Sequence, residues 1–216
     1  MKMMILAMLV SGGALFAQEA YIREYTGTVE VQAPGAAWTA AAAGMPITGD
    51  TRISTGFKST AVIVTGNSTL LLRPLTRLTL EELRKFQGDE DVRFYLQSGR
   101  VKADVHPPEG GTTNFTVRSP VATASVRGTS FEFDGVNLRT GEGLVHVTGR
   151  DGAGVYVGAG HKTVSDPETG RTAGTAETAQ AELTPAASVP AFADTAPEPA
   201  AIMPRMADAA VNFEWE

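Results

Sequence analysis

Short runs of alternating polar and apolar residues dominate the chain from Tyr21 to about Ser165. In "YTGTVEVQ", Val29 and Val31 share one face while Glu30 and Gln32 share the other. The later runs are "STAVIVTG", "STLLLRPLTRLTL", "DVRFYLQSGRVKADVH", "NFTVRSP", "TSFEFDG", "GLVHVTG" and "AGVYVGAG". Because Gly, Asn, Asp or Pro bounds each run, the pattern predicts an all-β fold, a single antiparallel β-sandwich of jelly-roll-like type.

Two segments fit this pattern less directly. The alanines of "AAWTAAAA", residues 36–43, favour a helix by propensity. Within a β pattern we instead expect a wide hairpin loop there, with Trp38 packed against a sheet edge. The segment "LTLEELRKF", residues 78–86, could form a helical turn. We expect a strand that ends in a charged loop, because "QGDED" follows and the strand pattern resumes at Val92.

The amino-terminal residues are typical of a secretory signal peptide. Lys2 precedes a short apolar run, and Ala17 precedes a polar residue. The run is shorter than the ~20 residues that a membrane-spanning helix needs. We therefore expect residues 1–17 to be a signal peptide, with cleavage after Ala14 or Ala20 as alternatives. The mature protein would be periplasmic or extracellular, with no transmembrane segment after signal removal.

The composition changes after Ser165. Residues 166–216 are rich in Ala, Pro and Thr, and large apolar residues are scarce up to residue 210. Such a segment buries too little surface to offset the entropy of ordering, so we expect a folded domain over 21–165 and a disordered tail over 166–216. The last residues, "VNFEWE", alternate as strands do, so Phe213 and Trp215 could form a docking strand. The alternative is a frayed acidic tail.

Composition and spacing exclude several kinds of chemistry. The formal net charge of −6 disfavours a nucleic-acid partner, and the absence of Cys excludes disulfides, thiolate zinc sites and a lipid-modified Cys. The three histidines, His106, His146 and His161, lack the spacing of a metal site. Acidic residues near turns, which are Asp50, Asp89, Asp91, Asp134 and Glu142, form no obvious catalytic pair. We expect Asp50 to cap its own turn. The sequence thus predicts no enzyme activity and no cofactor.

The most distinctive stretch is "SPVATASVRGTSFEF", residues 119–133. Together with "GTVEVQ", Trp38, "GMPITGDTRISTGFKSTAVIVTGNSTLLLRPLTRLTL", "LQSGRVKADV", "GLVHVTG" and "VGAG", it resembles the FecR domain in order and spacing, over about residues 25–165. The best-known members of that family are envelope sensors with a cytoplasmic segment that binds a sigma factor, a transmembrane helix and a periplasmic domain that meets an outer-membrane receptor. Here the expected signal peptide would stand in place of the first two parts. The resemblance therefore implies only the extracytoplasmic module.

The motif residues of this resemblance are Ser119, Pro120, Arg127, Gly128, Thr129 and Phe131. We expect a structural corner, with Pro120 at a strand start or sheet edge and a sharp turn at Gly128. A half-buried Arg127 would tie loops or a carboxylate together, and Thr129 would bond a turn backbone. Phe131 and Phe133 would share one strand face. The alternative is that Arg127 contacts a ligand.

Three functions compete at this point. The first is an exported, non-catalytic binding or scaffold module of the cell envelope, whose partner is an envelope protein or a surface polysaccharide. The second is a periplasmic sensor component that passes a signal towards the cytoplasm, which rests on the resemblance alone. The third is a glycan hydrolase with an unidentified carboxylate pair.

Overall fold

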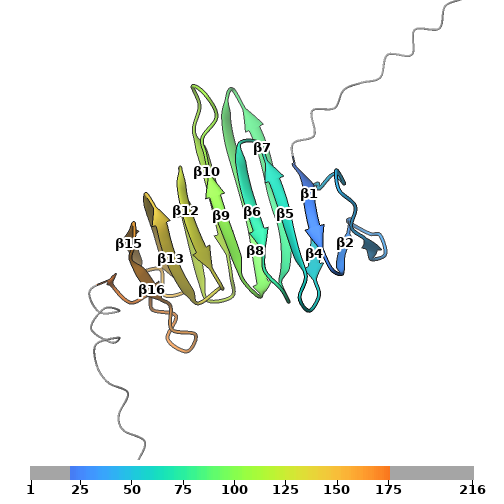
Figure 1. Ribbon diagram of the computed structural model, residues 1–216. Coiled ribbons are helices and arrows are strands. Elements are labelled where there is room, and N and C mark those ends of the chain that lie inside the picture. Colours follow the sequence, from blue (N-terminus) through green and yellow to red (C-terminus); the bar gives the residue numbers. More distant parts are fainter. Residues whose placement is uncertain (1–19, 176–216) are drawn as a thin grey trace, which may run out of the picture. The chain divides into compact units, whose positions relative to one another are not determined.

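Sixteen strands form two β-sheets in the computed structural model, which describes residues 20–175 (Figure 1). The seven-stranded sheet has the order β1 (Ala20–Thr26), β5 (Thr60–Thr65), β6 (Ser68–Leu72), β9 (Val101–Val105), β12 (Thr129–Phe133), β13 (Asn137–Glu142) and β16 (Lys162–Val164). The nine-stranded sheet has the order β15 (Gly154–Gly158), β14 (Leu144–Gly149), β11 (Ala122–Val126), β10 (Thr113–Arg118), β8 (Asp89–Ser98), β7 (Arg77–Phe86), β4 (Thr51–Thr55), β2 (Val29–Gln32) and β3 (Thr39–Ala40).

The core lies between the two sheets and follows from the alternation in the sequence. Strands such as β11 and β12 bury every second side chain, and these side chains join a single hydrophobic cluster. Its largest members include Phe94 and Phe115, whose ring centroids are 5.6 Å apart, and Phe131 and Phe133 of β12. Val29 and Val31 face inward as expected. The predicted all-β sandwich is confirmed.

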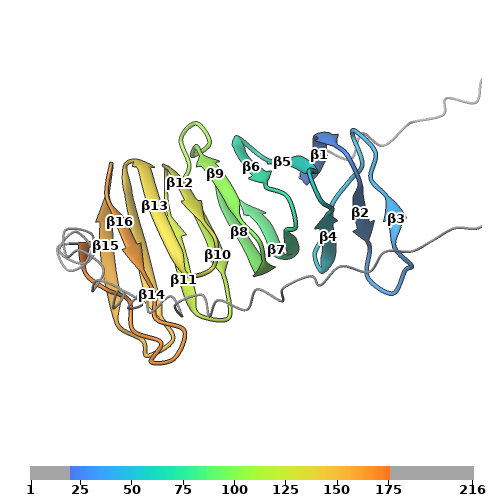
Figure 2. The same ribbon diagram turned by 60° about the horizontal axis from the view of Figure 1, so that its bottom comes forward.

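The chain advances steadily along the sandwich, as the colours in Figures 1 and 2 show. It crosses repeatedly between the sheets, and most strands pair with a strand that is close in sequence. One pair is parallel: β8 and β10 are neighbours in one sheet, while β9 between them lies in the other. The arrangement therefore differs in detail from a jelly roll, in which Greek-key connections bring distant strands together.

The β7–β8 hairpin corrects one expectation. The segment 78–86 is a strand as predicted, but no charged loop follows it, and β8 begins at Asp89 rather than at Val92. Phe86 pairs directly with Asp89 across a two-residue turn. Gln87 and Gly88 both have positive φ, 51° and 94°, which is the requirement of a type I′ turn.

The edge near Trp38 has the expected form. Residues 33–38 form the wide loop of a hairpin between β2 and the two-residue edge strand β3. Trp38 is 43% exposed and lines a shallow hollow with side chains of β2 and β4. The short edge strand limits the row of backbone groups open to unwanted pairing.

At the other end, the described fold continues beyond the predicted boundary at Ser165. Thr172 is buried and forms a bridge with Ser165, and their hydroxyls are 2.9 Å apart. The backbone N–H of Ala173 also donates to the carbonyl of Val164, at 2.9 Å. The first residues of the predicted tail thus belong to the folded part. The predicted signal peptide, Phe213 and Trp215 lie outside the described residues.

None of the residues from 20 to 175 forms a helix that is long and apolar enough to cross a membrane.

Candidate functional site

The motif of residues 119–133 occupies both ends of β11. Ser119 and Pro120 lie in the turn between β10 and β11. Arg127 and Gly128 form the crossover from β11 in the nine-stranded sheet to β12 in the seven-stranded sheet. The motif therefore joins two sheets rather than forming a single corner.

Ser119 has the structural role that the sequence indicated. Its Oγ accepts hydrogen bonds from the backbone N–H groups of Val121 and Ala122, at 3.1 and 3.0 Å. The same hydroxyl lies 2.6 Å from the carbonyl oxygen of Gly135 and donates to it. One side chain thus closes its own turn and attaches it to the β12–β13 turn. Pro120 is exposed within this turn, directly before β11.

Arg127 departs from the expectation. It is exposed, and it makes no hydrogen bond or ion pair with any residue of the described part of the chain. The predicted half-buried position is therefore wrong. The crossover carries Arg127 outward because it lies beyond the last inward-facing residue of β11, Val126. A guanidinium in this position keeps all of its donors available to a ligand.

Gly128 lies in the bend of this crossover, as the sequence predicts. Its φ of 159° is one that residues with side chains rarely adopt, although an added Cβ would meet only an ordinary contact, 3.4 Å from Cδ of Pro107. The closer contact lies at a second glycine. Gly143, between β13 and β14, has φ 75°, and an added Cβ there would lie 3.0 Å from the Gly128 oxygen and 2.8 Å from Thr129 Oγ1. Only glycine fits this close approach of two crossovers without strain.

Thr129 and Phe131 behave as predicted. The buried hydroxyl of Thr129 has two backbone acceptors within reach, the carbonyls of Gly128 at 2.7 Å and Leu144 at 3.2 Å. Phe131 and Phe133 point into the core from the same face of β12. Thr129 and Phe131 therefore anchor the start of β12, directly after the crossover that carries Arg127.

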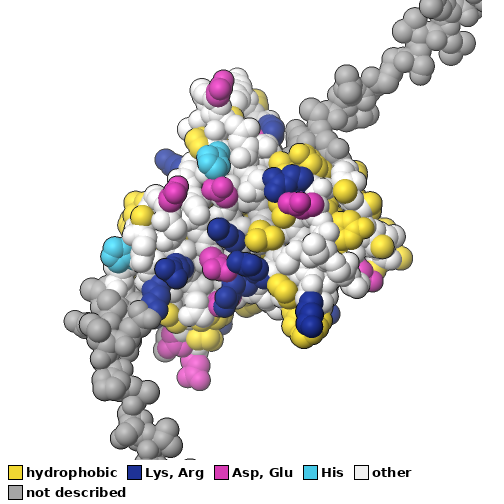
Figure 3. Space-filling model, viewed as in Figure 1, with side chains coloured by type: hydrophobic (Ala, Val, Ile, Leu, Met, Phe, Trp, Pro, Cys, Tyr) yellow, Lys and Arg dark blue, Asp and Glu magenta, His cyan; other side chains and the backbone are white. Residues whose placement is uncertain are grey.

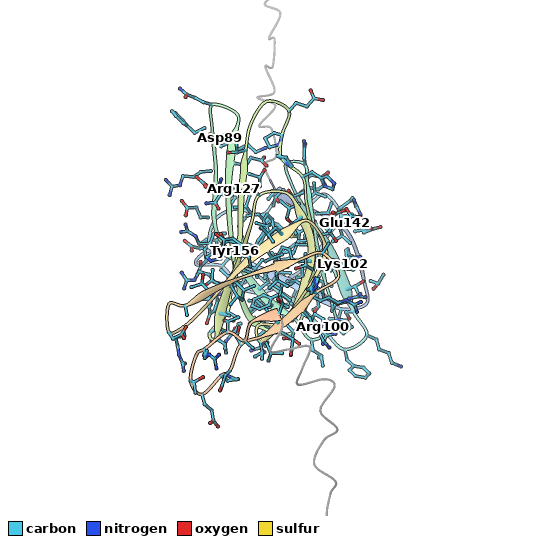
Figure 4. All side chains as sticks on the ribbon, turned by 90° about the vertical axis from the view of Figure 1, so that its left-hand side faces the viewer. Asp89, Arg100, Lys102, Arg127, Glu142 and Tyr156 are labelled. Atoms are coloured by element: carbon cyan, nitrogen blue, oxygen red, sulfur yellow. The ribbon has the colours of Figure 1, made fainter. Side chains whose placement is uncertain are left out.

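A hollow of about 790 Å³ opens beside this crossover. Side chains that line it include Asn114, Ser125, Arg127, Leu144, His146 and Tyr156. Ser125, His146 and Tyr156 are register partners across β11, β14 and β15, so they form one row on the outer face of the sheet. The rings of His146 and Tyr156 stack at 4.6 Å. In Figure 4, Arg127 and Tyr156 lie on the same side of the domain, opposite Lys102 and Glu142.

Two large side chains are exposed at the rim of this hollow. Tyr156 is 65% exposed and Leu144 is 54% exposed. No carboxylate is among the residues that line the hollow, so the charge of Arg127 is not balanced there. Arg and Tyr are the side chains that most often carry binding energy at protein interfaces. The arrangement suits a ligand that presents a carboxylate next to an apolar group.

The histidines are separated in space. His146 is half-buried on the outer face of β14, as predicted, while His106 and His161 are exposed elsewhere. The Nδ1 of His161 lies 3.0 Å from the carbonyl oxygen of Ala159. Within residues 20–175, no group of three or more His, Asp or Glu side chains is arranged to hold a metal ion.

Several acidic residues act as acceptors in turns. Asp89 accepts hydrogen bonds from the backbone N–H and the hydroxyl of Thr112, each at 2.8 Å, and these bonds lower its pKa. Asp91 accepts from Asn114 at 3.1 Å. Asp134 organises the β12–β13 turn, and Glu142 is exposed near the end of β13.

Asp50 does not cap its turn as expected. The backbone N–H of Thr48 instead lies 3.3 Å from the hydroxyl of Thr51, which takes this role. Asp50 supplies the left-handed backbone of the turn, with φ 63°. Asp is one of the few residues other than Gly that tolerate this conformation.

Residues 51–153 match the model of the FecR protein family. The chain carries a FecR domain. The match begins with β4 and ends just before β15, so it includes the whole 119–133 motif and every named residue of the hollow except Tyr156.

The chain is also similar to two crystal structures of a candidate anti-sigma factor from Parabacteroides distasonis, at 1.65 and 2.50 Å resolution. Each is 16% identical in sequence, with a TM-score of 0.46. The similarity covers 61% of this chain and 64% or 63% of those chains, which is less than two thirds of their length. No curated protein matches the chain.

Sequence reasoning did not single out the hollow. Alternation places His146 and Tyr156 on outer strand faces, but only the pairing of β14 with β15 brings them together beside Ser125. Leu144 follows Gly143, whose backbone turns it outward at the crossover. No local signal marks these three residues as neighbours of Arg127.

Proposed function

We propose that this FecR domain is a non-catalytic binding module exported to the cell envelope, and that it recognises a protein partner through the Arg127 hollow. One observation carries the proposal: the motif arginine has no partner in the described part of the chain and stands beside two exposed large side chains, Leu144 and Tyr156. A structural arginine would be paired. A recognition arginine keeps its donors available until the partner arrives.

The chemistry of the hollow defines the partner. The planar guanidinium of Arg127 can hold a carboxylate through two parallel hydrogen bonds. An apolar side chain next to that carboxylate would cover Leu144 and the face of Tyr156, removing both from water. The partner segment therefore carries Asp, Glu or a terminal carboxylate beside a large apolar residue.

The cellular context of the proposal is an envelope signalling system. It is supported by the FecR domain itself and by the sequence features of residues 1–17, which are typical of a secretory signal peptide. In that setting the module would bind a membrane protein that carries the signal further. We propose no catalytic role for the hollow, because no carboxylate lines it and Asp89 and Asp134 already serve as turn acceptors.

The test is affinity capture of the partner from envelope extract with the mature protein as bait. Arg127→Glu and Tyr156→Ser should each abolish capture. Arg139→Glu is the matched control, because Arg139 is also an exposed arginine but lies on the other sheet. The free energy of unfolding of Arg127→Glu, measured by thermal melting, should differ from that of the wild type by no more than about 0.5 kcal/mol. The reason is that Arg127 has no hydrogen bond or ion pair to lose within residues 20–175.

Two results would contradict the proposal. Capture that survives Arg127→Glu and Tyr156→Ser would move the binding surface elsewhere. A large loss of stability in Arg127→Glu would restore the structural interpretation of the motif.

A further inference from the structure

Three crossovers meet at the end of the sandwich that lies away from the β7–β8 turn. They are residues 56–59 between β4 and β5, residues 73–76 between β6 and β7, and residues 99–100 between β8 and β9. Backbone hydrogen bonds join them: Leu75 N–H to the Gly56 carbonyl at 3.2 Å, and Arg73 N–H to the Arg100 carbonyl at 3.0 Å. We call this surface the crossover end.

Two large apolar side chains project from the crossover end. Phe57 is 74% exposed and Leu75 is 59% exposed. The loops that carry them are held firmly, because Ser59 and Thr76 are buried and hydrogen-bonded to neighbouring backbone. The exposure of Phe57 and Leu75 is therefore a property of the folded state. An exposed apolar pair on well-ordered loops is typical of an interaction surface.

The backbone at these tips is unfavourable for the residues that occupy it. Leu75 has φ 59° and Lys58 has φ 55°, both in the left-handed region. Glycine adopts this conformation freely, whereas a bulky residue such as Leu is rarely found there. A strained, exposed leucine serves neither stability nor solubility, which points to a role for its side chain at this surface.

Positive charge surrounds the apolar pair. Lys58, Arg73, Arg77 and Arg100 lie on or next to the three crossovers. Arg73 is 3.7 Å from Glu132, and Arg100 is 3.4 Å from Asp134. Lys58 and Arg77 make no ion pair with any residue between 20 and 175. The crossover end therefore carries an excess of positive charge in a chain whose net charge is −6.

Figure 3 draws one face of the molecule. In the lower part of this view, Lys and Arg side chains lie close to exposed hydrophobic side chains. The ammonium group of Lys58 lies 5.7 Å from the ring centroid of Phe57, so charge and apolar surface are next to each other. A projecting apolar tip with basic residues around it has the chemistry of an interfacial membrane anchor.

We propose that the crossover end docks on an anionic lipid bilayer. Phe57 and Leu75 enter the headgroup region, while Lys58, Arg73, Arg77 and Arg100 contact the lipid phosphates. Charge complementarity and the projecting shape of the tips favour a membrane surface over a protein pocket. The site lies at the opposite end of β11 and β12 from Arg127, so the two surfaces can be occupied together.

The test uses the chain without residues 1–17 and sedimentation with two kinds of vesicle. One kind contains phosphatidylcholine alone, and the other contains phosphatidylcholine with phosphatidylglycerol. The wild-type protein should bind the anionic vesicles, and the bound fraction should fall as the salt concentration rises. Phe57→Ser should weaken that binding about tenfold, the effect expected when one aromatic side chain no longer leaves water.

Leu75→Gly and Phe86→Ser make the test specific. Leu75→Gly removes the apolar group and relieves the left-handed backbone, so it should weaken vesicle binding while the melting temperature stays the same or rises. Phe86 is 73% exposed but lies in the β7–β8 hairpin at the other end of β7, so Phe86→Ser should bind vesicles as the wild type does. Arg127→Glu should also retain vesicle binding, which separates this proposal from the protein-binding one.

Three outcomes would overturn the proposal. They are a wild-type protein that does not sediment with anionic vesicles, equal binding to vesicles without phosphatidylglycerol, and an equal loss of binding in Phe86→Ser and Phe57→Ser. Binding to a lipid-free envelope protein that depends on Phe57 and Leu75, without vesicle binding, would identify the crossover end as a protein interface instead.

Discussion

Single polar side chains hold the turns of this domain, and Asp134 is the most heavily used. Its carboxylate accepts the backbone N–H groups of Val136 and Asn137, at 3.1 and 2.7 Å, and lies 3.4 Å from the Arg100 guanidinium. Burial alone would raise its pKa. The hydrogen bonds from Asn137 and Val136, helped by the charge of Arg100, outweigh burial and lower the pKa below its ordinary value of 3.8.

Asp134→Ala should lower the free energy of unfolding at neutral pH by about 1–2 kcal/mol, because two backbone donors lose their acceptor. The folded-state pKa is depressed, so the contribution of the charged carboxylate is present above pH 3.8 and is lost as the pH falls through the lower folded value. Urea denaturation at neutral and acid pH should therefore show the wild type and the variant converging in acid.

Asp104→Ala is the control for this prediction, because Asp104 is an exposed aspartate whose nearest ion-pair partner, His106, is 4.0 Å away. It should have little effect on stability. A stability difference between the wild type and Asp134→Ala that does not change with pH would contradict the role of the charge.

At the residue scale, the alternation of polar and apolar residues predicts which strand side chains face the core. It does not predict the neighbours of an exposed side chain. Phe131 and Phe133 face the core because strand residues two apart share a face. The environment of Arg127 depends on where the β11–β12 crossover leaves the sandwich and on which side chains of β14 and β15 arrive there. Those neighbours come from distant segments, so no local pattern reveals whether this arginine is paired.

The crossovers are the elements that connect the two sheets, and two of them approach each other closely at Gly143. Gly143→Ala should destabilise the domain by about 1–3 kcal/mol, since it adds left-handed strain and a close contact with Gly128 and Thr129. Gly152→Ala is the matched control: Gly152 also has a positive φ, 83°, but an added Cβ there meets nothing within 4 Å.

Thermal denaturation of both variants separates two causes of destabilisation. Gly152→Ala gives the effect of the backbone strain alone, and Gly143→Ala gives the effect of the strain and the close contact together. The larger loss should occur at Gly143. Equal losses would mean that the two crossovers can move apart, and that their contact contributes nothing to stability.

The strands themselves were largely predictable, but the β7–β8 hairpin shows the limit. The segment "QGDED" has the composition of a loop. In the fold, Glu90 turns inward and pairs with Lys85 at 2.7 Å, so strand alternation continues through a residue type that is rarely buried. Because a glutamate occupies an inward-facing position, the alternation of polar and apolar residues that would predict the strand is interrupted there.

On the scale of the whole molecule, the end of the folded part can be tested by truncation. A chain ending at residue 175 should be more stable than one ending at 165 by about 1–3 kcal/mol, because the shorter chain leaves Ser165, Thr163 and Val164 without partners from Thr172 and Ala173. Limited proteolysis of the full chain should likewise stop no earlier than Ala173. Equal stability of the two chains would place the boundary at Ser165 after all.

The strand pattern predicted the sandwich, and the resemblance to the FecR domain predicted the family, which the family match confirms over residues 51–153. The order of strands within each sheet was beyond sequence reasoning. Alternation shows which side chains face inward, but a strand of either sheet gives the same pattern. The parallel pairing of β8 with β10 is determined by β9 joining the opposite sheet, which only the assembled fold reveals.

The steady advance of the chain along the sandwich also governs how the domain can form in time. Within the described residues, no register pair joins positions farther apart in sequence than Ala20 and Thr65. Each strand therefore finds its neighbour by closing a modest loop, and the entropic cost of each closure stays small. A polypeptide that emerges amino end first, from a ribosome or a translocation channel, can add strand after strand to an edge that is already in place.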